Sequence, residues 1–200
     1  MAKKSSKFED YFSHLKQISF LGHVYKRYIL SPVLLRCAHR FGSRVMEVGS
    51  GVGSGVLGAN PDSVDGLDIN PEAVEYCKTL DLNARLINDD GGFPIADAQY
   101  DSCVLDNVIE HIVEPRLTLD ECYRITKKNG GLVIAVPGMR GFQSDSDHKK
   151  FYGEGDLRML DERWQLESLF STPFLYKNEK LSLLFKQYCL VATYKKVELG

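Results

Sequence analysis

The chain has 200 residues, a hydrophobic fraction of 44% and a net charge of only −2. This length suits one domain with a sizeable core, and no uninterrupted apolar run is long enough to span a bilayer. The first residues lack the apolar core of a signal peptide, so we expect a soluble, cytoplasmic protein.

The charge is spread unevenly along the chain. Residues 1–44 carry nine Lys and Arg against two acidic residues, residues 45–125 carry four against sixteen, and residues 126–200 carry twelve against nine. An acidic centre suits a cationic ligand and a basic arm suits an anionic partner, although most of these charges are expected on ordinary solvated helix faces. The basic arm lacks the interleaved aromatic residues typical of RNA-binding surfaces, so we expect no nucleic-acid partner.

The cysteines are odd in number, widely spaced and set in apolar patterns, without a paired C-x-x-C motif. We therefore expect five buried free thiols in a reducing compartment. They are Cys37, Cys77, Cys103, Cys122 and Cys189.

The N-terminal part is predicted to be a helical arm. Residues 1–7 are expected to be disordered, and apolar residues recur at helical spacing over residues 8–41. Ser31 and Pro32 predict an N-cap and a first-turn proline. We expect a helical arm or cap over residues 1–43, with Tyr11, Phe12 and Tyr25 as packing residues or part of a lid, and a second domain over residues 44–200.

The rest of the chain alternates strands with helices. Strands are predicted at 45–48, 64–69, 85–87, 100–105 and 132–136, and helices at 56–59, 70–80 and 116–126. This alternation predicts a Rossmann-like, doubly wound α/β sheet with ligands at the carboxyl edge of the strands. Two runs near 164–170 and 187–195, with no helix between them, predict an antiparallel edge pair. The expected sheet therefore has seven strands, mostly parallel with the last antiparallel, and Trp164 in its core.

A glycine-rich turn follows the first strand directly, in the pattern Glu47-x-Gly49-x-Gly51-x-Gly53. About twenty residues later Asp68 ends the next strand, where it can accept both hydroxyls of a ribose. These features predict a nucleoside cofactor. Residues 53–58 also match the G-x-G-x-x-G dinucleotide fingerprint, but its first glycine comes several residues late after the strand. A nicotinamide enzyme therefore stays an alternative.

Five segments in this order resemble the class I S-adenosylmethionine-dependent methyltransferases, especially the type 11 or ubiquinone-methyltransferase-like group. The segments are residues 47–53, 66–71, 89–101, 107–115 and 124–131. The resemblance is close over residues 44–137 and looser elsewhere. It implies S-adenosylmethionine as the cofactor.

For the methionine end of the cofactor, the resemblance implies that Gly49, Ser50 and Gly51 lie against it. Glu47 would be oriented toward the ammonium group through water, and Asn107 would lie beside the methionine portion.

For the nucleoside end, the resemblance implies that Asp68 holds the ribose and Ile69 covers one face of the adenine. Asp89 would accept a hydrogen bond from the adenine amine, and Asp90 would supply a backbone N–H to the ring.

Methyl transfer needs little side-chain chemistry, because the sulfonium is already activated and positioning and water exclusion do most of the work. An oxygen nucleophile would also benefit from a base. The candidates are His111, implied to face the methyl group, and His148. Alternatively, His111 is an orienting or helix-capping group, and His148 is a hydrogen-bonding residue of its loop.

His148 lies in residues 145–152, which resemble a D-H-x-x-[FY]-[FY] segment of related enzymes, some of which modify sugars or surface glycans. Such loops line the acceptor pocket, so Tyr152 is predicted in the substrate loop. Asp145, Asp147 and His148 are a weak candidate set for a divalent ion, and we expect no metal.

We therefore predict an S-adenosylmethionine-dependent methyltransferase that acts on a small-molecule or glycan-like acceptor, at oxygen. The alternatives are a methyltransferase acting on a lipid quinone, protein or RNA, an NAD(P)-dependent oxidoreductase, and a non-catalytic binding protein with the same fold. The sequence leaves the acceptor and the oligomeric state open.

Overall fold

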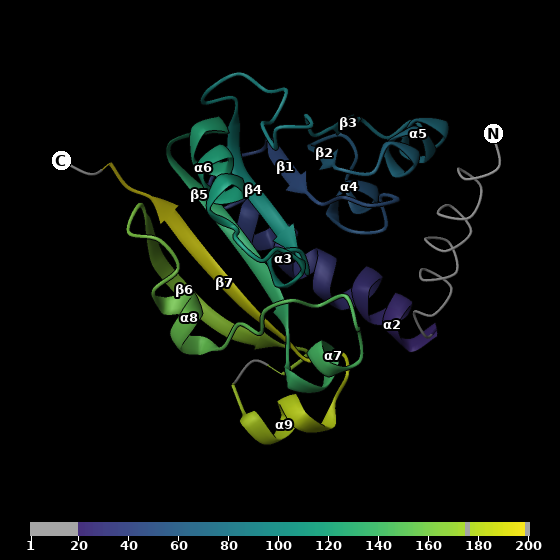
Figure 1. The fold of residues 1–200 in the computed structure, drawn as a ribbon, viewed down its shortest axis with the longest axis vertical. Coiled ribbons are helices and arrows are strands. Elements are labelled where there is room, and N and C mark those ends of the chain that lie inside the picture. The colour runs from purple at the N-terminus through teal and green to yellow at the C-terminus, as the bar shows by residue number, and fades with distance from the viewer. Residues whose placement is uncertain (1–19, 175–176, 199–200) are drawn as a thin grey trace.

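The computed structural model describes residues 20–174 and 177–198 (Figure 1). The predicted disorder of residues 1–7, and Tyr11 and Phe12, lie outside this part of the chain. The predicted split into an arm (1–43) and a second domain (44–200) stays a prediction. No helix among the described residues is long and apolar enough to cross a membrane.

The centre of the molecule is one seven-stranded sheet in the order β3-β2-β1-β4-β5-β7-β6. β7 is antiparallel to both its neighbours, and the other pairings are parallel. The predicted fold class is thus confirmed. The strands are β1 (Val45–Val48), β2 (Val64–Asp68), β3 (Ala84–Leu86), β4 (Tyr100–Asp106), β5 (Thr126–Pro137), β6 (Trp164–Thr172) and β7 (Cys189–Lys196).

Helices cover both faces of the sheet, as Figure 1 shows for α6 on one side and α3 on the other. The helices are α2 (Phe20–Tyr25), the π-helix η1 (Lys26–Leu30), α3 (Ser31–Ala38), α4 (Val56–Ala59), α5 (Pro71–Thr79), the 3₁₀ turn η2 (Ile109–His111), α6 (Arg116–Ile125), α7 (Met139–Gln143), α8 (Glu154–Arg158) and α9 (Glu179–Leu184).

Two hydrophobic cores lie on opposite faces of the sheet, because successive strand residues point to opposite sides. In β1, Met46 and Val48 join the core under α6, whereas Val45 joins the core under α3. Trp164 belongs to the first core, where its ring meets that of Tyr123 edge-on at 5.7 Å. All five cysteines are buried free thiols, as predicted.

The predicted start of α5 is confirmed. Pro71 is its first residue, and the Asn70 side chain accepts hydrogen bonds from the amides of Glu72 and Ala73 at 2.9 and 3.4 Å. These bonds satisfy two of the donors that a helix leaves unpaired at its start. The acid that ends β2 is therefore followed at once by a rigid helix.

The predicted N-cap at Ser31 is wrong. Ser31 has helical φ and ψ angles of −59° and −43°, and its amide bonds to the carbonyl of Lys26, so helical structure runs unbroken from Phe20 to Ala38. Proline cannot donate a backbone hydrogen bond. The wide π-turn changes the bonding pattern just before Pro32, and the helix continues through it.

Three other details differ from the predictions. The tail strands do pair antiparallel, but helix α9 lies between them. β5 begins at Thr126 rather than near residue 132, since Thr126 pairs with Tyr100 before the register shifts and pairing resumes at Gly131. The predicted loop of residues 145–152 lies between helices α7 (Met139–Gln143) and α8 (Glu154–Arg158), neither of which is predicted from the sequence.

Candidate active site

The glycine turn after β1 is held against the end of β2. The amides of Gly49 and Ser50 both donate to the carbonyl of Leu67, at 2.7 and 2.9 Å. Gly49 has a φ of +73°, and a Cβ there would lie 2.6 Å from the Val108 side chain. Glycine is needed at this position for both its conformation and its close approach.

Asp68 lies beside this turn with its carboxylate fixed by backbone donors. Its Oδ2 accepts from the Gly51 amide at 2.7 Å, and its Oδ1 accepts from the Asn70 amide at 2.8 Å. Burial raises the pKa of Asp68, against the opposing effect of these bonds. Each carboxylate oxygen retains capacity for a second hydrogen bond, so the group can also accept from two hydroxyls. Ile69, next to it, is 78% exposed.

Glu47 is buried in β1 and faces the start of α4. Its carboxylate accepts from the amides of Leu57 and Val56, at 2.7 and 3.2 Å. Burial raises the pKa of Glu47 to about 7. The carboxylate is thus engaged by a helix N-terminus, and its contact with a cofactor ammonium stays a prediction.

Lys26 reaches this region from the N-terminal helices, a contact that no motif in the sequence predicts. Its Nζ lies 3.1 Å from Oδ2 of Asp106, whose side chain is 1% exposed. Burial alone lowers the pKa of Lys26, but the carboxylates of Asp106 and Glu47 outweigh it and raise that pKa. The only sequence signal was a basic arm ahead of an acidic centre, which does not single out Lys26.

Asn107 follows Asp106 at the end of β4, half-buried, with a φ of +55°. Asparagine tolerates this left-handed conformation better than most residues. Its Nδ2 donates to Oδ1 of Asp106 at 2.7 Å. Asn107 therefore shares this edge with the Lys26–Asp106 pair.

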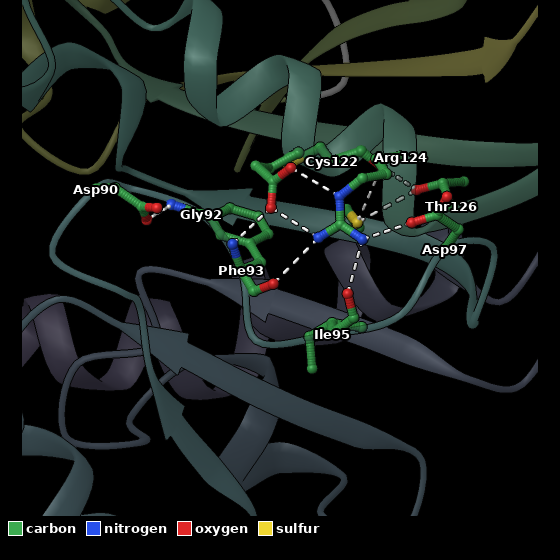
Figure 2. A network of polar contacts seen from close by, with 10 residues as sticks. Asp90, Gly92, Phe93, Ile95, Asp97, Cys122, Arg124 and Thr126 are labelled. Carbon is green, nitrogen blue, oxygen red and sulfur yellow. Dashed lines mark hydrogen bonds and ion pairs between the residues drawn. The ribbon is translucent and has the colours of Figure 1, made fainter.

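Asp89 and Asp90 are exposed in the loop between β3 and β4, where Asp90 accepts from the Gly92 amide at 2.9 Å. Figure 2 shows how Arg124 of α6 holds the next stretch of this loop. Its guanidinium donates to the carbonyls of Ile95 and Phe93, at 2.7 and 3.1 Å. The same group also bonds the carboxylates of Asp97 and Glu121 at 2.7 Å.

His111 and His148 lie together, with ring centroids 4.6 Å apart. His111 is half-exposed, and burial together with His148 lowers its pKa. His148 is more deeply placed: its ring stacks on Phe142 at 5.2 Å, and its Nδ1 lies 2.7 Å from the Phe142 carbonyl oxygen. The two histidines predicted as bases are therefore neighbours, and His111 is the more accessible.

Glu110 was missed as a functional candidate, although it lies inside the motif that drew attention to His111. It is fully buried beside the two histidines, with Oε1 4.0 Å from Nε2 of His148. Burial raises the pKa of Glu110 to about 8. Tyr152, predicted in the substrate loop, is 3% exposed and belongs to the hydrophobic core.

Residues 46–134 match the model of a family described as a methyltransferase domain, of type 11. No curated protein matches the sequence. The solved structures of similar fold include a methyltransferase from Aquifex aeolicus, at 18% identity and a TM-score of 0.63, covering 94% of this chain and 99% of that one.

Two further structures are similar. A geranyl diphosphate C-methyltransferase from Streptomyces coelicolor shares 14% identity at a TM-score of 0.63, covering 84% of this chain and 77% of that one. A methyltransferase chain solved with the Trm112 activator of Haloferax volcanii shares 15% identity at a TM-score of 0.61, covering 88% and 97%. At these identities the likeness shows the fold, and the family model shows the activity. The chain therefore contains a class I S-adenosylmethionine-dependent methyltransferase domain of type 11, over residues 46–134.

Proposed function

We propose that the chain transfers the methyl group of S-adenosylmethionine to an oxygen atom of a small-molecule or glycan-like acceptor. The observation that carries this proposal is the cluster of Glu110, His111 and His148 at the carboxyl edge of the sheet. A neutral hydroxyl is a weak nucleophile unless its proton is removed as it attacks, whereas a neutral amine attacks through its lone pair and can lose its proton afterwards. A cluster that can manage this proton is useful for oxygen methylation in particular.

A cavity of about 430 Å³, lined in part by Phe151 of the predicted substrate loop, supports a small acceptor. Its volume is in the range of pockets for small molecules. Its lining includes the apolar or aromatic residues Met139, Phe151 and Tyr188 and the polar residues Glu154 and Asn178. The Phe151 ring meets Phe142 edge-on at 5.4 Å, and Phe142 stacks on His148. The cavity is thus connected to the cluster through aromatic contacts.

The proposal is tested by an acceptor screen that measures S-adenosylhomocysteine formation. Sugars, glycan fragments and other hydroxylated compounds are compared with amines, quinols, a protein extract and RNA. We expect product with a hydroxylated compound, and a mass increase of one methyl group placed on its oxygen. Transfer only to nitrogen, to carbon, or to one of the macromolecules would contradict the proposal.

His111→Ala is expected to lower turnover by about 10²- to 10⁴-fold, the usual loss when a group that assists removal of the hydroxyl proton is deleted. Affinity for S-adenosylhomocysteine should stay within about twofold of the wild type, because His111 is assigned to the reaction and not to cofactor binding. Turnover and calorimetric affinity are measured on the same preparation. His39→Ala is the matched control, since His39 is exposed and bonds only the Ser63 side chain among the contacts described for it. Wild-type turnover in His111→Ala would remove His111 from the reaction.

Affinity for S-adenosylhomocysteine is expected to rise as the pH increases from 6 to 7.5. Burial raises the pKa of Glu47 to about 7, so this carboxyl is largely protonated at pH 6. A cofactor ammonium nearby favours the ionised form, and binding should therefore release protons below pH 7.

Calorimetry in two buffers of different ionisation enthalpy measures this proton release directly. In Glu47→Gln the group no longer titrates, and the pH dependence between 6 and 7.5 should flatten. Affinity that is independent of pH in the wild type would contradict the predicted contact between Glu47 and the ammonium.

A further inference from the structure

Three side chains with metal-ligating atoms meet at the carboxyl edge of the sheet. Glu110 and His111 come from η2, and His148 comes from the segment after α7; one ligand atom of each lies within 4.8 Å of the others. This is a different set from the three residues that the sequence offered as a weak metal candidate. Asp147, in that set, pairs instead with His111, at 3.4 Å between its Oδ2 and Nδ1 of the ring.

The environment of the Glu110 carboxylate indicates that it binds a ligand. Its side chain is 1% exposed, and neither carboxylate oxygen finds a hydrogen-bond donor in another residue of the described chain. Nε2 of His148 is 4.0 Å from Oε1, which is longer than a hydrogen bond. Buried carboxylates in proteins are normally paired, hydrogen-bonded or bound to a cation.

The two imidazoles are oriented as metal-binding histidines usually are. Nδ1 of His148 lies 2.7 Å from the Phe142 carbonyl oxygen, so this nitrogen must carry the hydrogen and donate. Nε2 then holds the lone pair, and it is this atom that lies across from Glu110. Asp147 has the equivalent role for His111, because its carboxylate lies next to Nδ1 of that ring. A carbonyl or carboxylate behind the ring fixes the tautomer and the direction of the ligating nitrogen.

The third ligand is held in place although it comes from a different segment. The amides of Lys149 and Lys150 both donate to the carbonyl oxygen of Glu110, at 2.7 and 3.1 Å. The Phe142 ring stacks on the other side of His148. These contacts attach the loop that carries His148 to the turn that carries Glu110 and His111.

We infer that Glu110, His111 and His148 bind one divalent transition-metal ion. Two imidazoles and one carboxylate suit Zn²⁺ or Mn²⁺, and three protein ligands leave a position open for an acceptor oxygen. Ligands bind such ions at roughly 2.0–2.2 Å, so small side-chain rotations would close the present arrangement around an ion.

The use of this ion rests on the proposed function. A bound ion lowers the pKa of a hydroxyl that coordinates it, and His111 then acts as a ligand rather than as the proton acceptor. The hydroxyl proton leaves to solvent as the oxygen–methyl bond forms and the sulfur–methyl bond breaks. The products are the methyl ether and S-adenosylhomocysteine.

The test uses full-length, untagged protein that has been freed of metal with a chelator. It is titrated with Zn²⁺ by calorimetry and with Co²⁺ by visible absorption, in the absence of any acceptor. We expect one high-affinity ion per chain, with a Co²⁺ spectrum typical of nitrogen and oxygen ligands. Glu110→Gln and His148→Ala should each weaken binding at least about tenfold, whereas His39→Ala should leave it unchanged. Calorimetry with S-adenosylhomocysteine verifies that each variant is folded.

Equal Zn²⁺ affinity in the wild type, Glu110→Gln and His148→Ala would overturn the inference. The proposed function fails separately from it. If Zn²⁺ binds these residues but no hydroxyl is methylated, the metal site stands and the oxygen acceptor is wrong. If hydroxyl methylation continues in chelator and Zn²⁺ does not bind, the acceptor stands and the metal site is wrong.

Discussion

Asp68→Ala is expected to weaken binding of S-adenosylhomocysteine by about 100-fold or more, because charge-assisted hydrogen bonds contribute roughly 1.5–3 kcal/mol each and two ribose hydroxyls are assigned to this carboxylate. The substitution also removes the acceptor for the Gly51 and Asn70 amides, which hold the glycine turn to the start of α5. Calorimetry at fixed pH measures the affinity.

Asp68→Asn separates these two contributions. The amide keeps the size of the side chain, but its NH₂ group faces a backbone donor at one of the two positions where the carboxylate accepts. We expect an affinity between those of the wild type and the alanine variant. Asp62→Asn is the control, since Asp62 is exposed just before β2. Wild-type affinity in Asp68→Ala would refute the ribose assignment.

Much of this site was predictable because it depends on local sequence. A glycine turn that directly follows a buried strand, and an acid at the end of the next strand, are brought together by parallel pairing alone. β1 and β2 pair in register from Val45 and Val64, so Gly49 and Asp68 reach the same edge. Asn70 and Pro71 likewise set the start of α5 through local bonds.

The missed features depend on contacts between distant segments. Lys26 pairs with Asp106 only because the N-terminal helices cross the end of the sheet, and no spacing in the sequence encodes that pair. In the sequence, Glu110 is only one polar residue of the motif that contains His111. It becomes a functional candidate because the fold buries it next to His148. Ser31 was misassigned because Ser-Pro is a strong local signal for a helix start, whereas a π-turn lets the helix run through it.

The loop that carries Asp89 and Asp90 is held to α6 mainly by Arg124, and substituting this residue gives the second large expected effect. Arg124→Met is expected to lower the free energy of unfolding by roughly 2–4 kcal/mol, because it leaves two backbone carbonyls without their donor and removes the guanidinium that pairs with the Glu121 carboxylate. This free-energy range is already reduced for solvent screening, because the Arg124 side chain is 31% exposed. For a chain of this size the loss corresponds to a fall of about 5–15 °C in Tm.

Two consequences distinguish this network from an ordinary stabilising contact. The Arg124 hydrogen bonds lower the pKa of Glu121, so their contribution is present above the usual pKa of a glutamate and is lost as the pH falls through the lowered value. The stability difference between the wild type and Arg124→Met should therefore shrink below about pH 4. Affinity for S-adenosylhomocysteine should also fall, because the loop assigned to the adenine would lose the hydrogen bonds that Arg124 donates to the carbonyls of Phe93 and Ile95.

Arg116→Met is the matched control for this experiment. Arg116 lies on the same helix, but its side chain is 78% exposed and its ion pair with Asp120 is long, at 4.0 Å. Such a pair contributes at most about 1 kcal/mol, so Tm and cofactor affinity should stay close to wild type. Thermal unfolding at several pH values and calorimetry with S-adenosylhomocysteine give both readouts. Unfolding of Arg124→Met at the wild-type temperature would contradict the network's contribution to stability, and wild-type cofactor affinity in a destabilised variant would restrict its role to the fold.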